Sequence, residues 1–375
     1  MAIELLSEYH SFLREKKDEG KKVIAFMSHD NIPEELIDAA GCVPLRMMFA
    51  GNDELMDASH DFLAPSTCAF AQSCIGVFSI NPDAFKFLEL IDYFIVSNHC
   101  VSDICASEVI AKYFNIPRLN FYVSYIKTEN SLKYFKIELM ALKEQLEGIT
   151  GTKIDNQILL NSIKKYNSFK TKLFEISKLS LIGSQKLKIY QKAMLFGPEM
   201  LSELDNLSLN KEIPRDLDKT KDLLLTGCSI FINDYLNDII EEGGGNIVFF
   251  DTWVGFNYYN QILDEDNLKN LADPIDLLTN RFKNNIYGDH SVPNFLDNKI
   301  SHIEQFSKDY MMKTGKKIGV INHIIKFCDH MSIMSSHLKN RLQEKGISVL
   351  NLERDYSRAN RGQLSTRIEA FLEMM

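Results

Sequence analysis

Apolar residues near the start of the chain recur at helical spacing. Leu5, Leu6, Tyr9 and Leu13 fall on one face of a helix, which predicts a helix from residue 3 to about residue 17. The chain therefore opens with an amphipathic helix whose apolar face needs a partner to pack against.

Short apolar runs alternate with helical patterns after that helix. Residues 22–27 and 43–47 are apolar enough to form strands, and a helix is expected between them at 31–41. Asn31 is suited to cap this helix and Pro33 to its first turn. The same order returns over 91–122, where two more strands flank a helix that runs through Tyr113. Strands that alternate with helices predict a mostly parallel sheet with helices on both faces.

The pattern changes twice more along the chain. Residues 130–209 are rich in Lys, Leu, Glu and Ile, which predicts several helices and no strands, and 212–216 is a plausible boundary. A second β/α set follows, with helices expected at 230–240 and around 337–343. Its expected strands are 222–226, 246–251, 317–321 and 348–352. Gly243–Gly245 follows a helix rather than a strand, so it is interpreted as a helix end and turn and not as a phosphate loop.

The chain is therefore predicted to be an α/β protein with two doubly wound, mostly parallel-sheet domains of flavodoxin or Rossmann type. An N-terminal α/β domain is assigned to residues 1–129 and a helical insert to 130–215. A C-terminal α/β domain is assigned to 216–375. In such sheets, ligands bind outside the carboxyl ends of the strands.

Composition narrows the class of protein further. The 375 residues are 45% hydrophobic and 25% charged, as in ordinary globular proteins. A formal net charge of −9 argues against a nucleic-acid partner, which needs a basic face. No apolar run is long enough to span a membrane, and the polar, acidic start is unlike a signal peptide, so a cytoplasmic protein is expected.

The cysteines are the strongest chemical signal. The chain has seven, an odd count without an export signal, so a disulfide framework is not expected. Cys68, Cys100, Cys228 and Cys328 are predicted on loops at the sheet edges, where distant segments converge. Cysteines that converge in this way can hold an iron–sulfur cluster. Cys42 sits at a helix-to-strand junction and is expected to be structural.

The remaining candidates carry weaker signals. Cys74 and Cys105 form loose pairs with Cys68 and Cys100, and they are interpreted as packing residues that could still reach the site. The other candidates near the same edge are a possible pocket hydroxyl, two histidines beside candidate cysteines and the only tryptophan: Ser28, His99, His330 and Trp253. No CxxC pair and no Walker motif is present, so neither a zinc ribbon nor ATP hydrolysis by this chain is expected.

The chain resembles a known family, the subunits of 2-hydroxyacyl-CoA dehydratases and of the related benzoyl-CoA reductases. The resemblance spans nearly the whole chain. It rests on an opening strand–helix–strand at 20–46, on cysteine motifs at 65–68, 98–103, 225–228 and 327–329, and on the C-terminal stretches GISVLNLERD (346–355) and GQLSTRIEAFLE (362–373). The C-terminal stretches are its most specific part.

The resemblance implies a [4Fe–4S] cluster on Cys68, Cys100 and Cys328. It also implies a homologous sister subunit in a heterodimer and a separate ATP-dependent iron–sulfur activator protein. The implied reaction removes water from an (R)-2-hydroxyacyl-CoA after one electron enters the thioester carbonyl and forms a ketyl radical. Such enzymes work without oxygen, because the exposed iron is open to oxidants.

Two departures from the family pattern favour a β-type subunit, which holds a cluster without the main catalytic pocket. The second cysteine motif has Val101 after Cys100, with the acid displaced to Asp103, and no acidic residue follows Arg46 through Gly51. The contribution of carboxylates to a substrate pocket is thereby in doubt.

Two alternatives stay open from the sequence. A double-cubane [8Fe–9S] reductase of the same family needs about six cysteines, which could be Cys68, Cys74, Cys100, Cys105, Cys228 and Cys328. A non-catalytic electron-relay subunit would need only a cluster within reach of a partner.

Overall fold

The structure is a computed structural model of the whole chain. It describes residues 2–27, 31–98, 100–124, 126–209, 220–263, 268, 273–287 and 294–375. The candidates Ser28 and His99 and the expected boundary at 212–216 lie outside these residues. In the described part of the chain, no helix is long and apolar enough to cross a membrane.

The first half builds a parallel sheet with the order β2-β1-β3-β4. Its strands are β1 (Val23–Met27), β2 (Val43–Met47), β3 (Ile91–Ser97) and β4 (Arg118–Phe121). Side chains alternate across β1, so that Val23, Ala25 and Met27 enter one apolar core and Ile24 and Phe26 enter another. Both faces of the sheet are therefore buried, as in a doubly wound fold.

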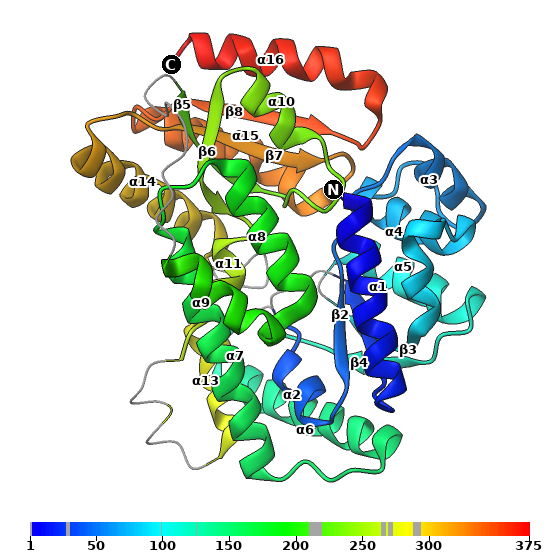
Figure 1. The fold of residues 1–375 in the computed structure, drawn as a ribbon. Helices are drawn as coiled ribbons and strands as arrows, with labels where there is room; N and C mark the ends of the chain where they lie inside the picture. The colour runs from blue at the N-terminus through cyan, green and yellow to red at the C-terminus, as the bar shows by residue number, and fades with distance from the viewer. Residues whose placement is uncertain are drawn as a thin grey trace.

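Helices cover both faces of this first sheet. They are α1 (Ala2–Asp18), α2 (Glu34–Ala39), α3 (Asp53–Ala58), η1 (Ser59–Asp61), α4 (Ala69–Ile80), η2 (Asp83–Leu90) and α5 (Val101–Tyr113). The middle of the chain is helical, as predicted. It comprises α6 (Glu129–Thr150), α7 (Asn156–Ser177), α8 (Gly183–Phe196), η3 (Gly197–Met200) and α9 (Leu201–Leu209). Figure 1 shows α7 and α8 running between the two sheet-containing halves of the molecule.

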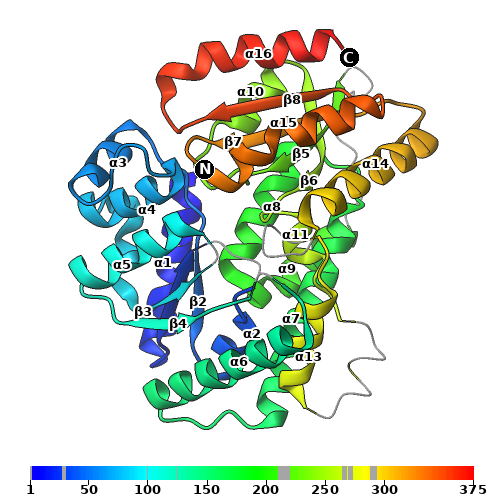
Figure 2. The ribbon, with the colours of Figure 1, turned by 180° about the vertical axis from the view of Figure 1, so that it is seen from behind.

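The second half repeats the topology of the first with the order β6-β5-β7-β8. Its strands are β5 (Lys221–Gly227), β6 (Gly245–Asp251), β7 (Gly319–Ile325) and β8 (Val349–Arg354). Its helices are α10 (Leu236–Glu242), α11 (Phe256–Tyr259), α13 (Pro274–Asn284), α14 (Phe295–Thr314), α15 (Asp329–Glu344), η5 (Arg358–Asn360) and α16 (Arg361–Glu373). Helices α10 and α16 pack on one face, and α14 and α15 on the other (Figures 1 and 2). The predicted fold class is confirmed.

The two halves meet at the carboxyl ends of their strands. An isolated parallel bridge joins Phe49, just after β2, to Ile232, beyond the end of β5. It is held by backbone hydrogen bonds from Ile232 N to Met48 O (3.0 Å) and from Ala50 N to Ile232 O (2.8 Å). One apolar core runs from β1 through α7 and α8 to β5. The ligand-binding edges of the two sheets are therefore brought together.

Three details of the predicted elements are wrong. The helix expected from residue 230 begins only at Leu236, because the preceding segment crosses to pair with the first half. Helix α2 has Pro33 rather than Asn31 at its N-cap, without a side-chain cap. Strand β7 continues to Ile325, four residues past its expected end. Asn322 and His323 are polar although they are buried, so they interrupt the apolar run from which the strand was predicted.

Candidate functional site

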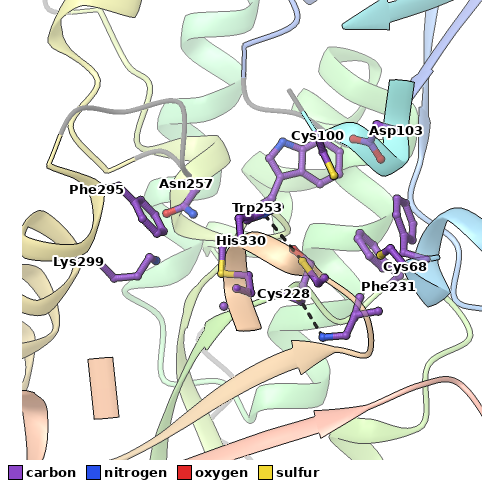
Figure 3. A pocket seen from close by; sticks show the side chains of 16 residues that line it. Cys68, Cys100, Asp103, Cys228, Phe231, Trp253, Asn257, Phe295, Lys299 and His330 are labelled. Carbon is purple, nitrogen blue, oxygen red and sulfur yellow. Dashed lines mark hydrogen bonds between the residues drawn. The ribbon is translucent and has the colours of Figure 1, made fainter. Parts of the chain in front are cut away.

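A cavity lies where the carboxyl ends of β3, β5, β6 and β7 converge. It holds about 780 Å³ of space between atoms, part of it open to solvent. Four cysteines line one part of its wall, namely Cys68, Cys100, Cys228 and Cys328. Aromatic, polar and charged side chains complete it, including Phe70, Asp103, Phe231, Trp253, Asn257, Lys299 and His330 (Figure 3). The four cysteines expected at the sheet edges are thus brought to one place.

The three predicted cluster ligands share one local geometry. Cys68, Cys100 and Cys328 are the N-cap residues of α4, α5 and α15. None of the three side chains makes a cap hydrogen bond, and the first-turn N–H groups act to lower the pKa of each thiol only against larger raising effects. The positive end of a helix favours a thiolate, so all three positions are suited to metal-ligating sulfur.

Backbone contacts bring Cys68 and Cys328 together from opposite halves of the chain. The N–H of Ala69 donates to the carbonyl of Lys326 at 3.1 Å, which places the start of α4 beside the loop after β7. A hydrogen bond to the Cys328 thiol, together with burial, raises the pKa of Cys68 well above its usual value. A hydrogen bond to Cys228 and burial likewise raise the pKa of Cys328, against a lowering contact with Cys68. The thiols of Cys68, Cys228 and Cys328 therefore lie near one another in the cavity wall.

Cys100 reaches the same cavity without such a thiol partner. Burial and then the nearby carboxylate of Asp103 raise its pKa to about 12. The Asp103 side chain is itself buried at the cavity wall. Without a bound cation these thiols are protonated at neutral pH, since burial in apolar surroundings disfavours the charged form.

Cys228 is held by the neighbouring strand β7. Its N–H donates to the carbonyl of His323 at 2.8 Å, and its thiol accepts the N–H of Ile325 at 3.4 Å. Gly227, which precedes it, has a φ of 90°, and a Cβ there would clash with the His323 carbonyl. Glycine is required at this turn, since an L-residue would be strained and would collide.

A second left-handed residue precedes Cys328. Phe327 has a φ of 64°, an unusual conformation for a bulky residue. It lets the chain turn sharply from β7 into α15, so that Cys328 caps the helix with its thiol in the cavity. Backbone strain of this kind is concentrated at functional sites.

A buried polar network supports the cavity wall in the second half. The Lys299 ammonium of α14 donates to Asp251 Oδ2 at 2.8 Å and to Thr226 Oγ1 at 3.3 Å, and Thr226 Oγ1 donates to Asp251 Oδ2 at 2.8 Å. Burial acts to raise the pKa of Asp251, but Lys299 and His302 outweigh it and lower the pKa to about 2. This network fixes the strand ends that lead into Cys228 and Trp253.

A larger charge network lies in the first half, away from the cavity. Arg46 of β2 is wholly buried and bonds to Glu34 of α2, to the carbonyl of Met194 and to the Tyr258 hydroxyl. Beside it, Glu35 pairs with Arg281 of α13. This network ties the first sheet to helices from later in the chain.

Lys170 of α7 completes this network at the edge of Glu35. Its ammonium lies 3.7 Å from the Glu35 carboxylate. Burial and then Arg281 lower the pKa of Lys170 to about 8, against the raising effect of Glu35. For Glu35, burial is outweighed by Arg281 and Lys170, which lower its pKa to about 2.

Some of the other sequence candidates line the cavity, and the rest lie outside its lining. Trp253 and His330 line the cavity, and His330 Nε2 lies 3.9 Å from Cys328 Sγ. Cys74 is buried within α4, Cys105 is exposed on α5, and Cys42 is in the core beside α2, so none of these three lines the cavity.

The cavity presents the type of donor that an iron–sulfur cluster uses, namely cysteine sulfur. Across the described residues, no three His, Cys, Asp or Glu side chains are arranged to hold one ion. A cubane cluster presents several irons, each bound by its own thiolate, so its ligands surround a volume rather than a point. Four converging sulfur donors, three of them at helix N-termini, match that requirement.

Sequence reasoning missed the polar wall opposite the thiols. Lys299 and Asp251 are far apart in sequence and carry no motif, and Asn257 lies in the four-residue helix α11. The one usable signal was position, since Asp251 ends strand β6 and Trp253 and Asn257 follow it closely.

Known proteins resemble this chain over most of its length. Residues 31–375 match the family model described as "2-hydroxyglutaryl-CoA dehydratase, D-component". The chain is 25% identical to YjiM of Escherichia coli (strain K12) over 359 residues, which is 92% of this chain and 89% of that protein. It is 24% identical to the (R)-phenyllactyl-CoA dehydratase beta subunit of Clostridium sporogenes (97% and 94% covered), and 23% identical to lactoyl-CoA dehydratase subunit beta of Anaerotignum propionicum (96% and 93%).

Proposed function

The chain belongs to the 2-hydroxyglutaryl-CoA dehydratase D-component family, and we propose that it is the cluster-binding, β-type subunit of an (R)-2-hydroxyacyl-CoA dehydratase. The observation that carries the proposal is the meeting of Cys68, Cys100 and Cys328 as three helix N-caps around one cavity. These thiolates would hold a [4Fe–4S] cluster. Cys228 also lines the cavity, but it is not assigned as a ligand of this cluster.

The reaction calls for chemistry that side chains alone do not supply. The β-proton of an acyl thioester is only weakly acidic, and general acid–base catalysis contributes roughly 10²–10⁴-fold. A cluster bound here would supply one low-potential electron to the thioester carbonyl, so that the resulting ketyl radical could expel the 2-hydroxyl as hydroxide and lose the acidified β-proton. The same electron would then return from the product radical to the cluster, because removal of water is redox-neutral. A separate ATP-dependent activator would deliver that electron, because this sequence has no Walker motif.

The chain's own residues shield the site. Phe70 and Phe231 stack at 4.5 Å between ring centroids and form part of the cavity wall. Trp253 packs edge-on against Tyr258 and covers another side. Aromatic walls exclude water, which strengthens electrostatic interactions within the cavity and limits side reactions.

The surroundings of the cavity support a protein partner. Val101 beside Cys100 is 71% exposed, Phe327 beside Cys328 is 39% exposed, and Ile333 on α15 is 80% exposed. Large apolar side chains grouped around a functional opening are typical of protein interfaces. We assign this surface to a homologous sister subunit, in keeping with the beta-subunit names of the relatives.

The test is an anaerobic assay with reduced activator, ATP and a panel of (R)-2-hydroxyacyl-CoAs, together with iron and sulfide quantification. About four irons per chain and an enoyl-CoA product are expected. Reduction of a small unsaturated molecule with about eight irons would instead support the double-cubane reductase. If the protein bound a cluster but catalysed neither the dehydration nor the reduction, a non-catalytic electron-relay role would be supported instead.

A further inference from the structure

The buried charge network around Arg46 has no part in the chemistry proposed above, but one of its members belongs to the segment that forms the cavity wall. Tyr258 lies in α11, five residues after Trp253, which lines the cavity together with the four cysteines (Figure 3). The Tyr258 ring packs edge-on against the Trp253 indole, with 6.3 Å between the ring centroids. Tyr258 therefore contacts both the charge network and the cavity wall.

The hydroxyl of Tyr258 is fixed by two buried charges. It accepts a hydrogen bond from Arg46 Nη2 at 3.1 Å and donates one to Glu34 Oε2 at 2.8 Å. Arg46 is wholly buried and Glu34 is 4% exposed, so water does not compete for these bonds. A phenol hydroxyl has one proton to donate, so a bond in each direction defines its orientation. Since Glu34 and Arg46 belong to α2 and β2, the first half of the chain sets the position of this ring.

The ring of Tyr258 is held at its face as well. The Arg46 guanidinium lies 5.5 Å from the ring centroid, and the Lys170 ammonium lies 5.0 Å from it. A cation over an aromatic face is attracted to the electron density of the ring. Phe169 packs against the same ring edge-on at 6.3 Å. The Tyr258 ring is therefore a rigid surface for the indole to pack on.

The Trp253 side chain has no comparable polar anchor. Its indole Nε1 is buried without a hydrogen-bond partner among the described residues. The backbone is fixed, because Trp253 O accepts the N–H of Gly255 at 2.9 Å and Val254 N donates to Ser229 Oγ at 3.0 Å. These bonds place the Cα of Trp253 but leave its side-chain dihedrals to packing. The edge-on contact with Tyr258 is of the kind that gives aromatic pairs a preferred orientation.

We propose that Tyr258 is a positioning residue, whose hydroxyl is held by Glu34 and Arg46 and whose ring holds the Trp253 indole in the cavity wall. The indole in this position limits the access of water and oxygen to a group bound at the cysteines, and this second part rests on the proposed function. The role suits a β-type subunit, because it requires a shielded cluster and no substrate pocket.

The single tryptophan of the chain provides the first readout. Quenching of Trp253 emission by acrylamide is measured on the cluster-free, full-length chain and on Tyr258→Phe, which keeps the ring and removes the hydroxyl. Loss of one hydrogen bond shifts an equilibrium between two indole positions by about fivefold, so the quenching constant should rise by about twofold or more.

Tyr259→Phe is the matched control. Tyr259 is the next residue of α11 and is also buried, but its ring packs against Tyr190 and Phe256 rather than against Trp253. Removal of its hydroxyl should leave the quenching constant unchanged.

The second readout is the lifetime of the reconstituted cluster in air, followed by its visible absorbance. Tyr258→Phe should shorten this lifetime by about twofold to fivefold, and Trp253→Phe should shorten it at least as much. The double variant should lose its cluster no faster than Trp253→Phe, because Tyr258 acts through the indole and the two effects are then not additive. A general loss of stability would instead add to the effect of Trp253→Phe.

Three results would overturn the proposal. They are equal quenching in Tyr258→Phe and the unaltered protein, an equal rise in Tyr259→Phe, and a double variant whose cluster lifetime shows the full product of the two single effects. If the unaltered protein takes up no cluster, the proposed function fails, and the quenching measurement still decides whether Tyr258 positions the indole.

Discussion

The two halves of the molecule share a strand order but stabilise their buried charges differently. In the first half, Arg46 and Glu34 depend on partners from α8 and α11, far along the chain. In the second half, Asp251 is neutralised by Lys299 of a helix packed on the same sheet. The first half is thus completed by later chain, whereas the second is closer to self-contained. Two halves with the same strand order can therefore differ in how far their buried charges depend on side chains from other parts of the chain.

The halves also present their cysteines differently. Cys68 in the first half follows Thr67, which has no positive φ, into the N-terminus of α4, and Cys100 is the N-cap of α5. Cys228 and Cys328 in the second half each follow a residue with a positive φ, Gly227 and Phe327. The second half therefore adds a left-handed residue before each of its two cavity cysteines.

The largest expected effect tests whether both halves are needed for the cluster. Cys68→Ala, Cys100→Ala and Cys328→Ala should each abolish the visible absorbance of the anaerobically reconstituted protein, because a cluster with two protein thiolates is not retained. Cys105→Ala, on an exposed face of α5, is the matched control and should keep its iron. If the cluster survived in Cys328→Ala but was lost in Cys42→Ala, the assignment of Cys328 as a cluster ligand would be wrong.

The next effect separates the two charge networks. Arg46→Met removes the direct ion-pair partner of buried Glu34 and should cost about 3–5 kcal/mol of unfolding free energy in urea. Lys299→Met should cost less, about 2–3 kcal/mol, because Asp251 keeps Thr226 and His302. The exposed Lys308→Met should change stability by less than about 0.5 kcal/mol. If Arg46→Met and Lys299→Met lowered the unfolding free energy by the same amount, the proposed difference between the two charge networks would be wrong.

A smaller effect tests the strained turns of the second half. Gly227→Ala should destabilise the protein by about 1–3 kcal/mol, because the new Cβ strikes the His323 carbonyl and lies 2.8 Å from Asn322 Oδ1. Phe327→Gly should relieve the left-handed strain and change stability by no more than about 1 kcal/mol. Thermal unfolding of the two variants measures both changes in stability. If Gly227→Ala left the Tm unchanged, the backbone at this turn would be able to adjust to a side chain.

The smallest effect is the pH dependence that Lys170 of the first network contributes. The folded pKa of Lys170, about 8, lies below its ordinary value of 10.5, so the unfolded chain binds more protons between these values. Stability must therefore rise with pH across that window, by about 1 kcal/mol per pH unit for this group. The difference in unfolding free energy between the unaltered protein and Lys170→Met should grow between pH 8 and pH 9.5. A constant difference would show that Lys170 does not titrate there.

Local patterns were enough to predict much of this molecule. The alternation of apolar runs and helical stretches indicated the two parallel sheets, and placement on loops at the sheet edges indicated that Cys68, Cys100, Cys228 and Cys328 would converge. The late start of α10 was missed, because Ile230–Tyr235 has helical apolar spacing but is held by pairing with the first half. The Lys299–Asp251 pair and the unpaired Asn257 were missed as well, since side-chain partners from distant segments leave no local pattern.

The contact between Ala69 and Lys326 has a consequence for biosynthesis. It joins the start of α4 to the loop before Cys328, segments more than half the chain apart. Cys68 leaves the ribosome long before Cys328 is translated, so the early thiols wait, unassembled, while the rest of the protein is made. A group that Cys68 and Cys328 bind together can therefore be inserted only after Cys328 has been synthesised. The cell must keep the Cys68 thiol reduced until then.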